Sequence, residues 1–137
     1  MTFESSSPSF ATFSSFDSSL QLALTIARGA DDRKGADILL LEVGEVSYLA
    51  EYFVIVTGFS KTQVRAIAQS IQAATAERHQ RSPKHTEGVS DCSWVVLDYG
   101  DVIAHVLLEQ ERQFYNLEAF WGHAQAIEFV PEEATQS

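Results

Sequence analysis

The chain has 137 residues, which is enough for one domain whose core folds without disulfides or a structural metal. Apolar residues make up 45% of it, and no apolar run approaches the ~20 residues that a membrane-spanning helix needs. The net charge of −10 and the single Cys92 exclude a disulfide framework within the chain and fit a reducing compartment.

Residues 1–17 are rich in Ser and Phe and contain no Lys or Arg, so the charged start of a secretory signal is missing. This composition predicts a disordered arm, with a partner-docking arm that uses its Phe side chains as the alternative. A short helical pattern follows over residues 20–27. Asp17, Ser18 or Ser19 is the expected N-cap, and Gly29 lies near the expected end.

The middle of the chain alternates between strand and helix patterns. Residues 37–43 predict a strand, 44–51 a connection, and 52–57 a second strand that is apolar enough to be buried on both faces. Ser60 is the expected N-cap of a helix that runs to about Arg81, where Ser82 and Pro83 end it. Residues 85–89 predict a short edge strand.

Residues 94–108 are the most informative segment of the chain. Two β-rich runs, 94–97 and 102–108, flank Asp98-Tyr99-Gly100-Asp101, and Gly and Asp suit the tight turn of a hairpin. A helix over about 111–121 follows. The elements together predict an α/β fold in a single domain, a mixed β-sheet flanked by helices.

A Trp, two Asp and a His are unusual within such a hairpin. Strand alternation places Trp94, Val96 and Asp98 on one face of the sheet and Val95 and Leu97 on the other. If no helix covers the Trp94 face, it offers an aromatic anchor surrounded by acids, which is the usual composition of an interface hot spot. The alternative is that Trp94 belongs to the core and that His105 is an internal histidine with its hydrogen bonds satisfied.

Charge is concentrated toward the C-terminal end. Eight acidic residues lie between positions 98 and 133 against one basic residue, Arg112. Such a surface repels phosphate backbones, so we expect no direct nucleic-acid binding, and it suits a basic protein partner. The alternative is that the acids only keep the protein in solution. Residues 124–137 are expected to form an acidic extension.

Catalytic patterns are weak. The Gly58-Phe59-Ser60 turn invites comparison with nucleotidyltransferases, but these enzymes need two metal-binding carboxylates shortly after the turn, and Glu77 is the only acid between positions 61 and 80. The four His residues show no metal-ligand spacing, so no metal or cofactor is expected. A Cys92–His105 dyad and an Asp98–Asp101 acid–base pair are minor alternatives, because a buried Cys and turn-forming Asp residues are commoner.

These motifs, in this order, resemble the Iojap family, the bacterial and organellar ribosome silencing factors (RsfS). The resemblance covers roughly residues 18–121. It rests on the strands from Asp37 and Tyr52, the helix that begins near Ser60, the hairpin, and a C-terminal segment matched at Arg112, Tyr115, Leu117, Glu118 and Trp121. The family's fold is related to that of nucleotidyltransferases, here without the catalytic carboxylates. It implies a domain over residues 18–123.

The resemblance implies a non-enzymatic function. Proteins of this family bind the large ribosomal subunit through ribosomal protein uL-fourteen, block subunit joining and so repress translation, and relatives form homodimers. The compartment implied is the cytoplasm, or the plastid stroma for an organellar protein. Carried over by position, the expected partner-binding residues are Trp94, Asp98, Asp101, His105, Glu109 and Tyr115. From their place on the last helix, Tyr115 and Trp121 are expected to be packing residues, with a place at the rim of the interface as the alternative for Tyr115. The alternative functions are a degenerate nucleotidyltransferase that binds a nucleotide at residues 58–63 and an adaptor whose partner is not the ribosome.

Overall fold

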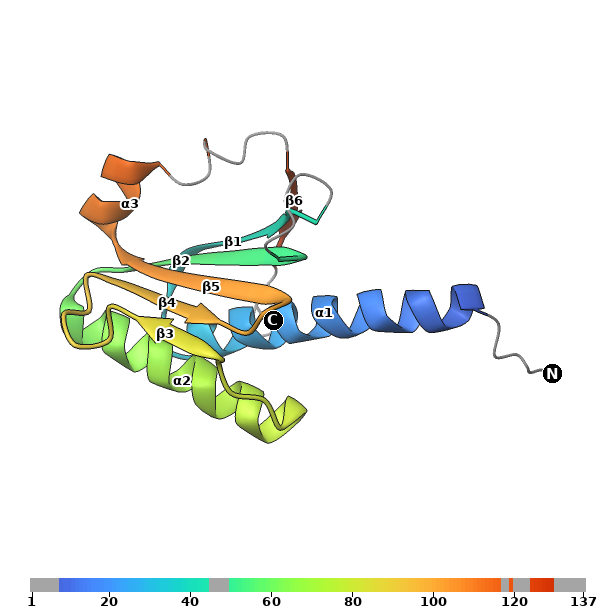
Figure 1. Ribbon diagram of the computed structural model, residues 1–137. Helices are drawn as coiled ribbons and strands as arrows, with labels where there is room; N and C mark the ends of the chain where they lie inside the picture. Colours follow the sequence, from blue (N-terminus) through green and yellow to red (C-terminus); the bar gives the residue numbers. More distant parts are fainter. Residues whose placement is uncertain (1–7, 45–49, 117–118, 120–123, 130–137) are drawn as a thin grey trace, which may run out of the picture.

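A computed structural model describes residues 8–44, 50–116, 119 and 124–129. In this part of the chain a six-stranded mixed sheet carries two long helices on one face and a short helix on the other (Figure 1). The strand order is β3-β4-β5-β2-β1-β6, in which only β2 and β5 pair in parallel. The predicted α/β fold with a mixed sheet flanked by helices is confirmed. Its kinship with nucleotidyltransferases stays a prediction.

The strands lie close to their predicted places. They are β1 (Ala36–Glu42), β2 (Tyr52–Gly58), β3 (His85–Glu87), β4 (Trp94–Asp98), β5 (Val102–Leu108) and β6 (Gln125–Glu128). Strand β2 is buried along its whole length, as expected. Strand β6 was not predicted, because four residues within the expected acidic extension are too few to show a clear pattern. It pairs antiparallel with β1, so this part of the extension belongs to the sheet.

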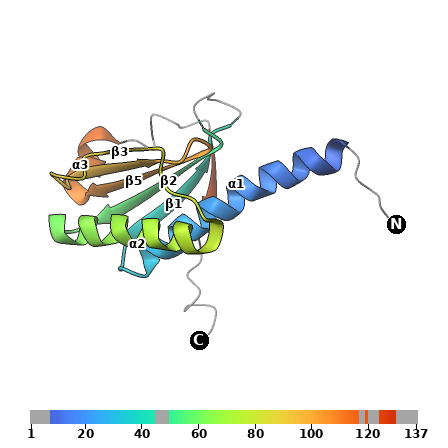
Figure 2. The same ribbon diagram turned by 60° about the horizontal axis from the view of Figure 1, so that its bottom comes forward.

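The three helices are α1 (Pro8–Asp31), α2 (Lys61–His79) and α3 (Glu109–Tyr115). The predicted start of the first helix at residues 17–19 is wrong. Helix α1 begins at Pro8, where proline's missing N–H is not needed, and it continues through ten residues of the predicted disordered arm. Residues 1–7 lie outside the described residues. The N-terminal part of α1 projects beyond the sheet, whereas its C-terminal part packs beside α2 (Figure 2).

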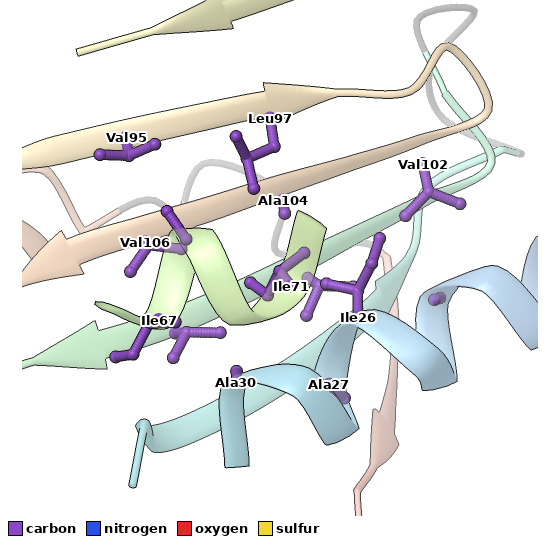
Figure 3. Packing of buried hydrophobic residues seen from close by; sticks show 14 of the residues in the cluster. Ile26, Ala27, Ala30, Ile67, Ile71, Val95, Leu97, Val102, Ala104 and Val106 are labelled. Atoms are coloured by element: carbon purple, nitrogen blue, oxygen red, sulfur yellow. The ribbon is translucent and has the colours of Figure 1, made fainter. Parts of the chain in front are cut away.

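The main core lies between the sheet and helices α1 and α2. Ile26 from α1 and Ile67 and Ile71 from α2 face Leu97 and Val106 of the sheet (Figure 3). The two helices approach closely at Gly29, where a Cβ atom would lie 3.0 Å from the Cα of Ile71. Burial of these apolar side chains, each worth about 2 kcal/mol, fixes both helices to one face of the sheet.

Helix α2 is capped as predicted. The Ser60 hydroxyl accepts a hydrogen bond of 3.0 Å from the Gln63 backbone N–H, and the Gln63 side-chain oxygen accepts one of 2.8 Å from the Phe59 backbone N–H. This arrangement is similar to a capping box, with the Gln63 side chain bonded one residue before the N-cap. The last predicted helix is shorter than expected. It ends at Tyr115, because Asn116 adopts the left-handed conformation of a C-cap; residues 117–118 and 120–123, including Trp121, lie outside the described residues.

The opposite face of the sheet carries a second, smaller apolar cluster. Its buried members include Phe53, Ile55 and Leu107, and Trp94 and Ile103 pack against them while half-buried. Helices α1 and α2 do not cover this face (Figure 1), and α3 contacts β5 and β2. Strand alternation therefore directs Trp94 and its neighbours to the less protected side of the sheet.

Candidate functional site

The turn between β4 and β5 has the predicted hairpin form. The Asp98 carboxylate accepts a hydrogen bond of 2.8 Å from the Gly100 backbone N–H, and the Tyr99 N–H donates to the Val102 carbonyl at 2.9 Å. Gly100 has a φ of 96°, which glycine adopts with little strain. The Asp98 carboxylate and the positive φ of Gly100 thus account for the local geometry of the turn.

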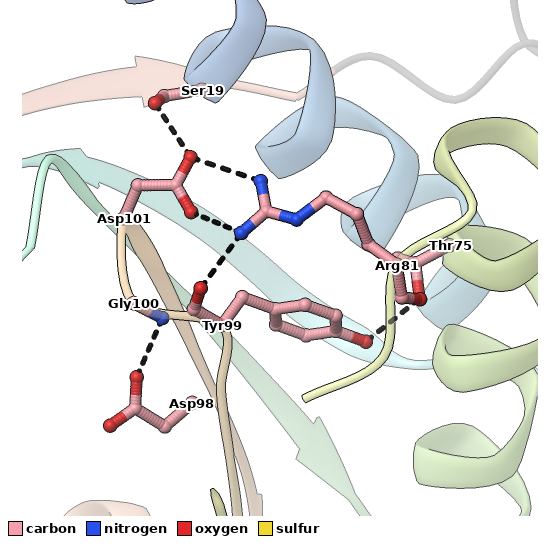
Figure 4. Close-up of polar contacts among 7 residues, drawn as sticks. All are labelled: Ser19, Thr75, Arg81, Asp98, Tyr99, Gly100 and Asp101. Atoms are coloured by element: carbon pink, nitrogen blue, oxygen red, sulfur yellow. Dashed lines mark hydrogen bonds and ion pairs between the residues drawn. The ribbon is translucent and has the colours of Figure 1, made fainter. Parts of the chain in front are cut away.

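A polar network fixes this turn to the helices (Figure 4). The Arg81 guanidinium donates to both Asp101 oxygens at 2.8 and 3.2 Å and to the Tyr99 carbonyl at 2.8 Å, and the Ser19 hydroxyl donates to Asp101 at 2.8 Å. The Tyr99 hydroxyl lies 2.9 Å from that of Thr75, and burial raises the pKa of Tyr99. The hairpin is therefore tied to α1, to α2 and to the segment after α2.

This network sets Asp101 apart from the other predicted site residues. Burial by itself raises the pKa of Asp101, but the hydrogen bonds from Arg81 and Ser19 and the Arg81 charge outweigh it and lower the pKa below its usual value. Both oxygens of the carboxylate are already engaged within the chain, toward the helices. Asp101 is thus placed to hold the hairpin in position.

An aromatic series runs from the sheet to α3. Ring centroids lie 5.1 Å apart for Phe53 and His105, 6.0 Å for His105 and Trp94, 4.9 Å for Trp94 and Tyr115, and 4.9 Å for Tyr115 and Phe114. The inner members are buried or half-buried, whereas Tyr115 is 53% and Phe114 80% exposed. We call Trp94, His105, Phe114 and Tyr115 the aromatic face. On this face Trp94 and His105 are packed against the sheet, whereas Phe114 and Tyr115 are exposed.

His105 is the polar member within this series. The Trp94 indole N–H donates to His105 Nδ1 at 3.2 Å, which places the proton of the neutral ring on Nε2. Burial lowers the pKa of His105 to about 4, although the Asp98 charge acts to raise it. Within the described part of the chain, buried Nε2 has no hydrogen-bond partner. The ring therefore presents one unsatisfied donor beside Trp94.

We expect the buried His105 to make folding stability depend on pH. Its pKa is lower in the folded chain than in the unfolded chain, where it is near 6.5, so the unfolded state binds the proton more tightly. Stability should therefore be full above pH 6.5 and fall toward pH 4, with a slope of at most about 1.4 kcal/mol per pH unit from this group. Urea unfolding at each pH measures this. His105→Gln should flatten the dependence of the unfolding free energy on pH in this interval. An unchanged slope would contradict the assignment of the pH dependence to His105.

Two predicted acids flank the aromatic face. Asp98 ends β4 and pairs in register with Ile103, while Glu109 begins α3 directly after β5. Since Trp94 pairs with Leu107 at the other end of β4, the two carboxylates stand at opposite ends of the surface. Of the six predicted residues, Trp94, His105 and Tyr115 come together, Asp98 and Glu109 flank them, and Asp101 lies apart.

Three contributors are absent from the predicted site residues, although Arg112 is one of the positions that carry the family resemblance. Phe114 adjoins Tyr115 in the chain and offered a signal as an apolar residue on a polar helix. Arg81 pairs with Asp101, twenty residues away, and Arg112 contacts strand ends through its side chain. Neither long-range contact has a local pattern that sequence reasoning could detect, because each depends on how the sheet is assembled.

The structure does not bring together the residues of the minor catalytic alternatives. Cys92 packs in the core on the helix side, where its thiol donates to the Val89 carbonyl, whereas His105 lies on the opposite face. Asp98 and Asp101 likewise have separate surroundings, and Ser60 is engaged as a helix cap. No group of His, Cys, Asp and Glu side chains suited to a metal ion occurs among the described residues. Nor does that part of the chain contain a helix able to cross a membrane.

Comparisons with known proteins agree with this arrangement. A family model described as ribosomal silencing factor during starvation matches residues 16–137. Ribosomal silencing factor RsfS of Bacillus subtilis is 42% identical over 98 residues, which cover 72% of this chain and 82% of that protein. The chloroplastic protein Iojap of Arabidopsis thaliana is 36% identical over 118 residues, covering 86% of this chain and 49% of that protein.

Solved structures give the same result. A crystal structure from Chromobacterium violaceum matches with a TM-score of 0.73 and 32% identity, covering 81% of this chain and 91% of that one. A second, from Bacillus halodurans, matches with a TM-score of 0.66 and 34% identity, covering 80% and 96%. The family match extends over most of the sequence and confirms the resemblance inferred from its motifs. The chain belongs to the family of ribosomal silencing factors that includes RsfS and Iojap.

Proposed function

We propose that this chain binds the large ribosomal subunit through ribosomal protein uL-fourteen and blocks the joining of the small subunit. Its family supports a role in the regulation of ribosomes or translation. The observation that supports a binding function most strongly is the aromatic face, in which exposed Tyr115 packs on half-buried Trp94 and exposed Phe114 packs on Tyr115, outside the main core.

The chemistry of this surface fits a basic protein partner. Aromatic side chains that combine a packed base with an exposed edge are typical hot-spot residues. Asp98 and Glu109, at the two ends of the face, would meet Lys or Arg side chains of the partner. His105 would act beneath this surface: its Nε2 is buried, and its Nδ1 accepts the indole N–H of Trp94 and so holds that ring in place.

The mechanism that follows is steric occlusion. A protein seated on the joining face of the large subunit excludes the small subunit, and no covalent bond is made or broken. Translation is then repressed in proportion to the occupied subunits. Relatives that match this chain come from bacteria and chloroplasts, and we propose action in a bacterial cytoplasm or a plastid stroma.

Co-sedimentation with isolated large subunits tests this proposal. We expect the purified chain to sediment with large subunits at low salt and to reduce the yield of joined ribosomes when small subunits are added. Small subunits alone should not retain it. Binding without loss of joining would contradict occlusion, and absence of binding at low salt would contradict the function itself.

We further propose that the aromatic face pairs with a second copy of this chain when no ribosome is present. Exposed apolar rings in water favour such pairing, and the exposed fractions of Phe114 and Tyr115 supply the surface. Light scattering over a concentration series should show a dimer that Trp94→Ala weakens. A monomer at all concentrations, or a dimer that Trp94→Ala leaves intact, would contradict pairing through this face.

A further inference from the structure

Helix α3 has little to hold it on the sheet by itself. It has seven residues, none of them buried, and its N-cap residue Leu108 makes no side-chain capping bond. Helices of this length are unstable in water without tertiary contacts. A hollow of about 230 Å³ lies beside it, lined by Asp37, Thr57 and four α3-region residues including Arg112. Contacts from outside the helix must therefore fix its position.

Arg112 supplies one such contact. Its Nη1 donates to the Asp37 carbonyl at 2.7 Å and to the Thr57 hydroxyl at 2.9 Å. Thr57 is 1% exposed near the end of β2, so its hydroxyl is a fixed acceptor. Asp37 lies where the β1–β2 register shifts, with a φ of 50°. One guanidinium thus joins α3 to two neighbouring strands.

The second contact is three residues further along the helix. Tyr115 packs on Trp94, and positions three apart lie on the same side of a helix. Arg112 and Tyr115 therefore act as two attachment points on one side of α3. Phe114 follows the orientation that these two points set, and its ring meets that of Tyr115 nearly at a right angle.

We propose that Arg112 is a positioning residue for partner binding: it holds α3 on the ends of β1 and β2 so that Phe114 and Tyr115 are preformed with Trp94 as one surface. The partner it fits is a protein with an apolar socket for Phe114 between basic side chains. This inference rests on the proposed function. A surface fixed before binding loses less conformational freedom on association, so Arg112 raises affinity without touching the partner.

The test compares Arg112→Met with wild type in co-sedimentation with isolated large subunits. Methionine keeps an unbranched apolar stem but removes the guanidinium. We expect about tenfold weaker binding because α3 must then be ordered on association. Loss of a positive charge would by itself favour a basic partner, so weakening cannot come from charge. Arg112→Lys should recover part of the affinity, and Arg65→Met, on the exposed side of α2, should change nothing.

A double-mutant cycle distinguishes positioning from general damage. If Arg112 acts through α3, Tyr115→Ala should cost less affinity in the Arg112→Met background than in wild type. Trp94 fluorescence in a Trp121→Phe background should also change on Arg112→Met. If wild type binds and Arg112→Met binds equally well, the positioning role is overturned but the proposed function is not. Additive effects of Arg112→Met and Tyr115→Ala would have the same meaning. Absence of wild-type binding would overturn the proposed function as well.

Discussion

Trp94→Ala is expected to give the largest loss of binding to the large ribosomal subunit. Trp94 connects His105 in the sheet to Tyr115 on α3, so its removal takes away a contact area and the support for the exposed rings. Truncation of a central aromatic residue in an interface costs about 2 kcal/mol or more, which is a loss of roughly 30-fold or greater. Co-sedimentation over a range of subunit concentrations measures this change.

Two comparisons keep this prediction specific. Val89→Ala is an exposed apolar control, because Val89 is 46% exposed and lines a hollow beside α2, on the helix side of the sheet, and it should bind like wild type. Trp94→Phe keeps an aromatic ring but loses the hydrogen bond to His105, so an intermediate loss is expected. If Trp94→Ala is folded and binds the large subunit with the same affinity as wild type, the aromatic face is not the binding surface.

The sequence predicted most of the fold because the relevant signals are local. Strand alternation assigned Trp94 and Val95 to opposite faces, and the Asp-Tyr-Gly-Asp turn located the hairpin. Ser60 as a helix cap was also confirmed. The predicted start of α1 is wrong, because the cap-type residues Asp17, Ser18 and Ser19 lie inside a helix that begins at Pro8. Helix continuation is cooperative and depends on packing further along the chain.

The candidate site was predicted less completely because its geometry is not local. Trp94, His105 and Tyr115 are predicted from the family resemblance and their chemistry, and β4–β5 pairing and the position of α3 bring them together. Asp101 belongs to the same set through the family resemblance and its negative charge. Its partner Arg81 comes after α2, and only the assembled fold shows that the carboxylate faces the helices. Acidic residues that cluster in a sequence can therefore include both surface charges and carboxylates that form hydrogen bonds within the fold.

Asp101→Ala is expected to give the largest loss of folding stability among these polar substitutions. It leaves the Arg81 guanidinium, 32% exposed, without its counter-charge and the nearly buried Ser19 hydroxyl without an acceptor. Removing one partner of a buried ion pair costs 3–5 kcal/mol; since this pair is partly screened by water, we expect about 3 kcal/mol or somewhat less. Urea unfolding at pH 7 measures this loss.

The exposed ion pair of Lys61 and Asp91 provides the control. Its side chains are 58% and 63% exposed and 3.2 Å apart, so Asp91→Ala should leave the unfolding midpoint unchanged. Arg81→Met should destabilise the chain as Asp101→Ala does. The double substitution should cost less than the sum, because each single change already breaks the same pair. Strict additivity would show that the two side chains act independently.

The pH dependence gives an independent check on the Asp101 assignment. Its pKa is lowered in the folded chain, so its contribution to stability is present above the unfolded value near 3.9 and is lost as the pH falls further. His105 acts in a separate interval, between about pH 6.5 and its lowered pKa of about 4. Asp101→Ala should therefore reduce the dependence of the unfolding free energy on pH below pH 4 and leave its dependence above pH 4 unchanged. A changed slope only above pH 4 would assign the coupling to His105 and contradict the role of the Arg81–Asp101 pair.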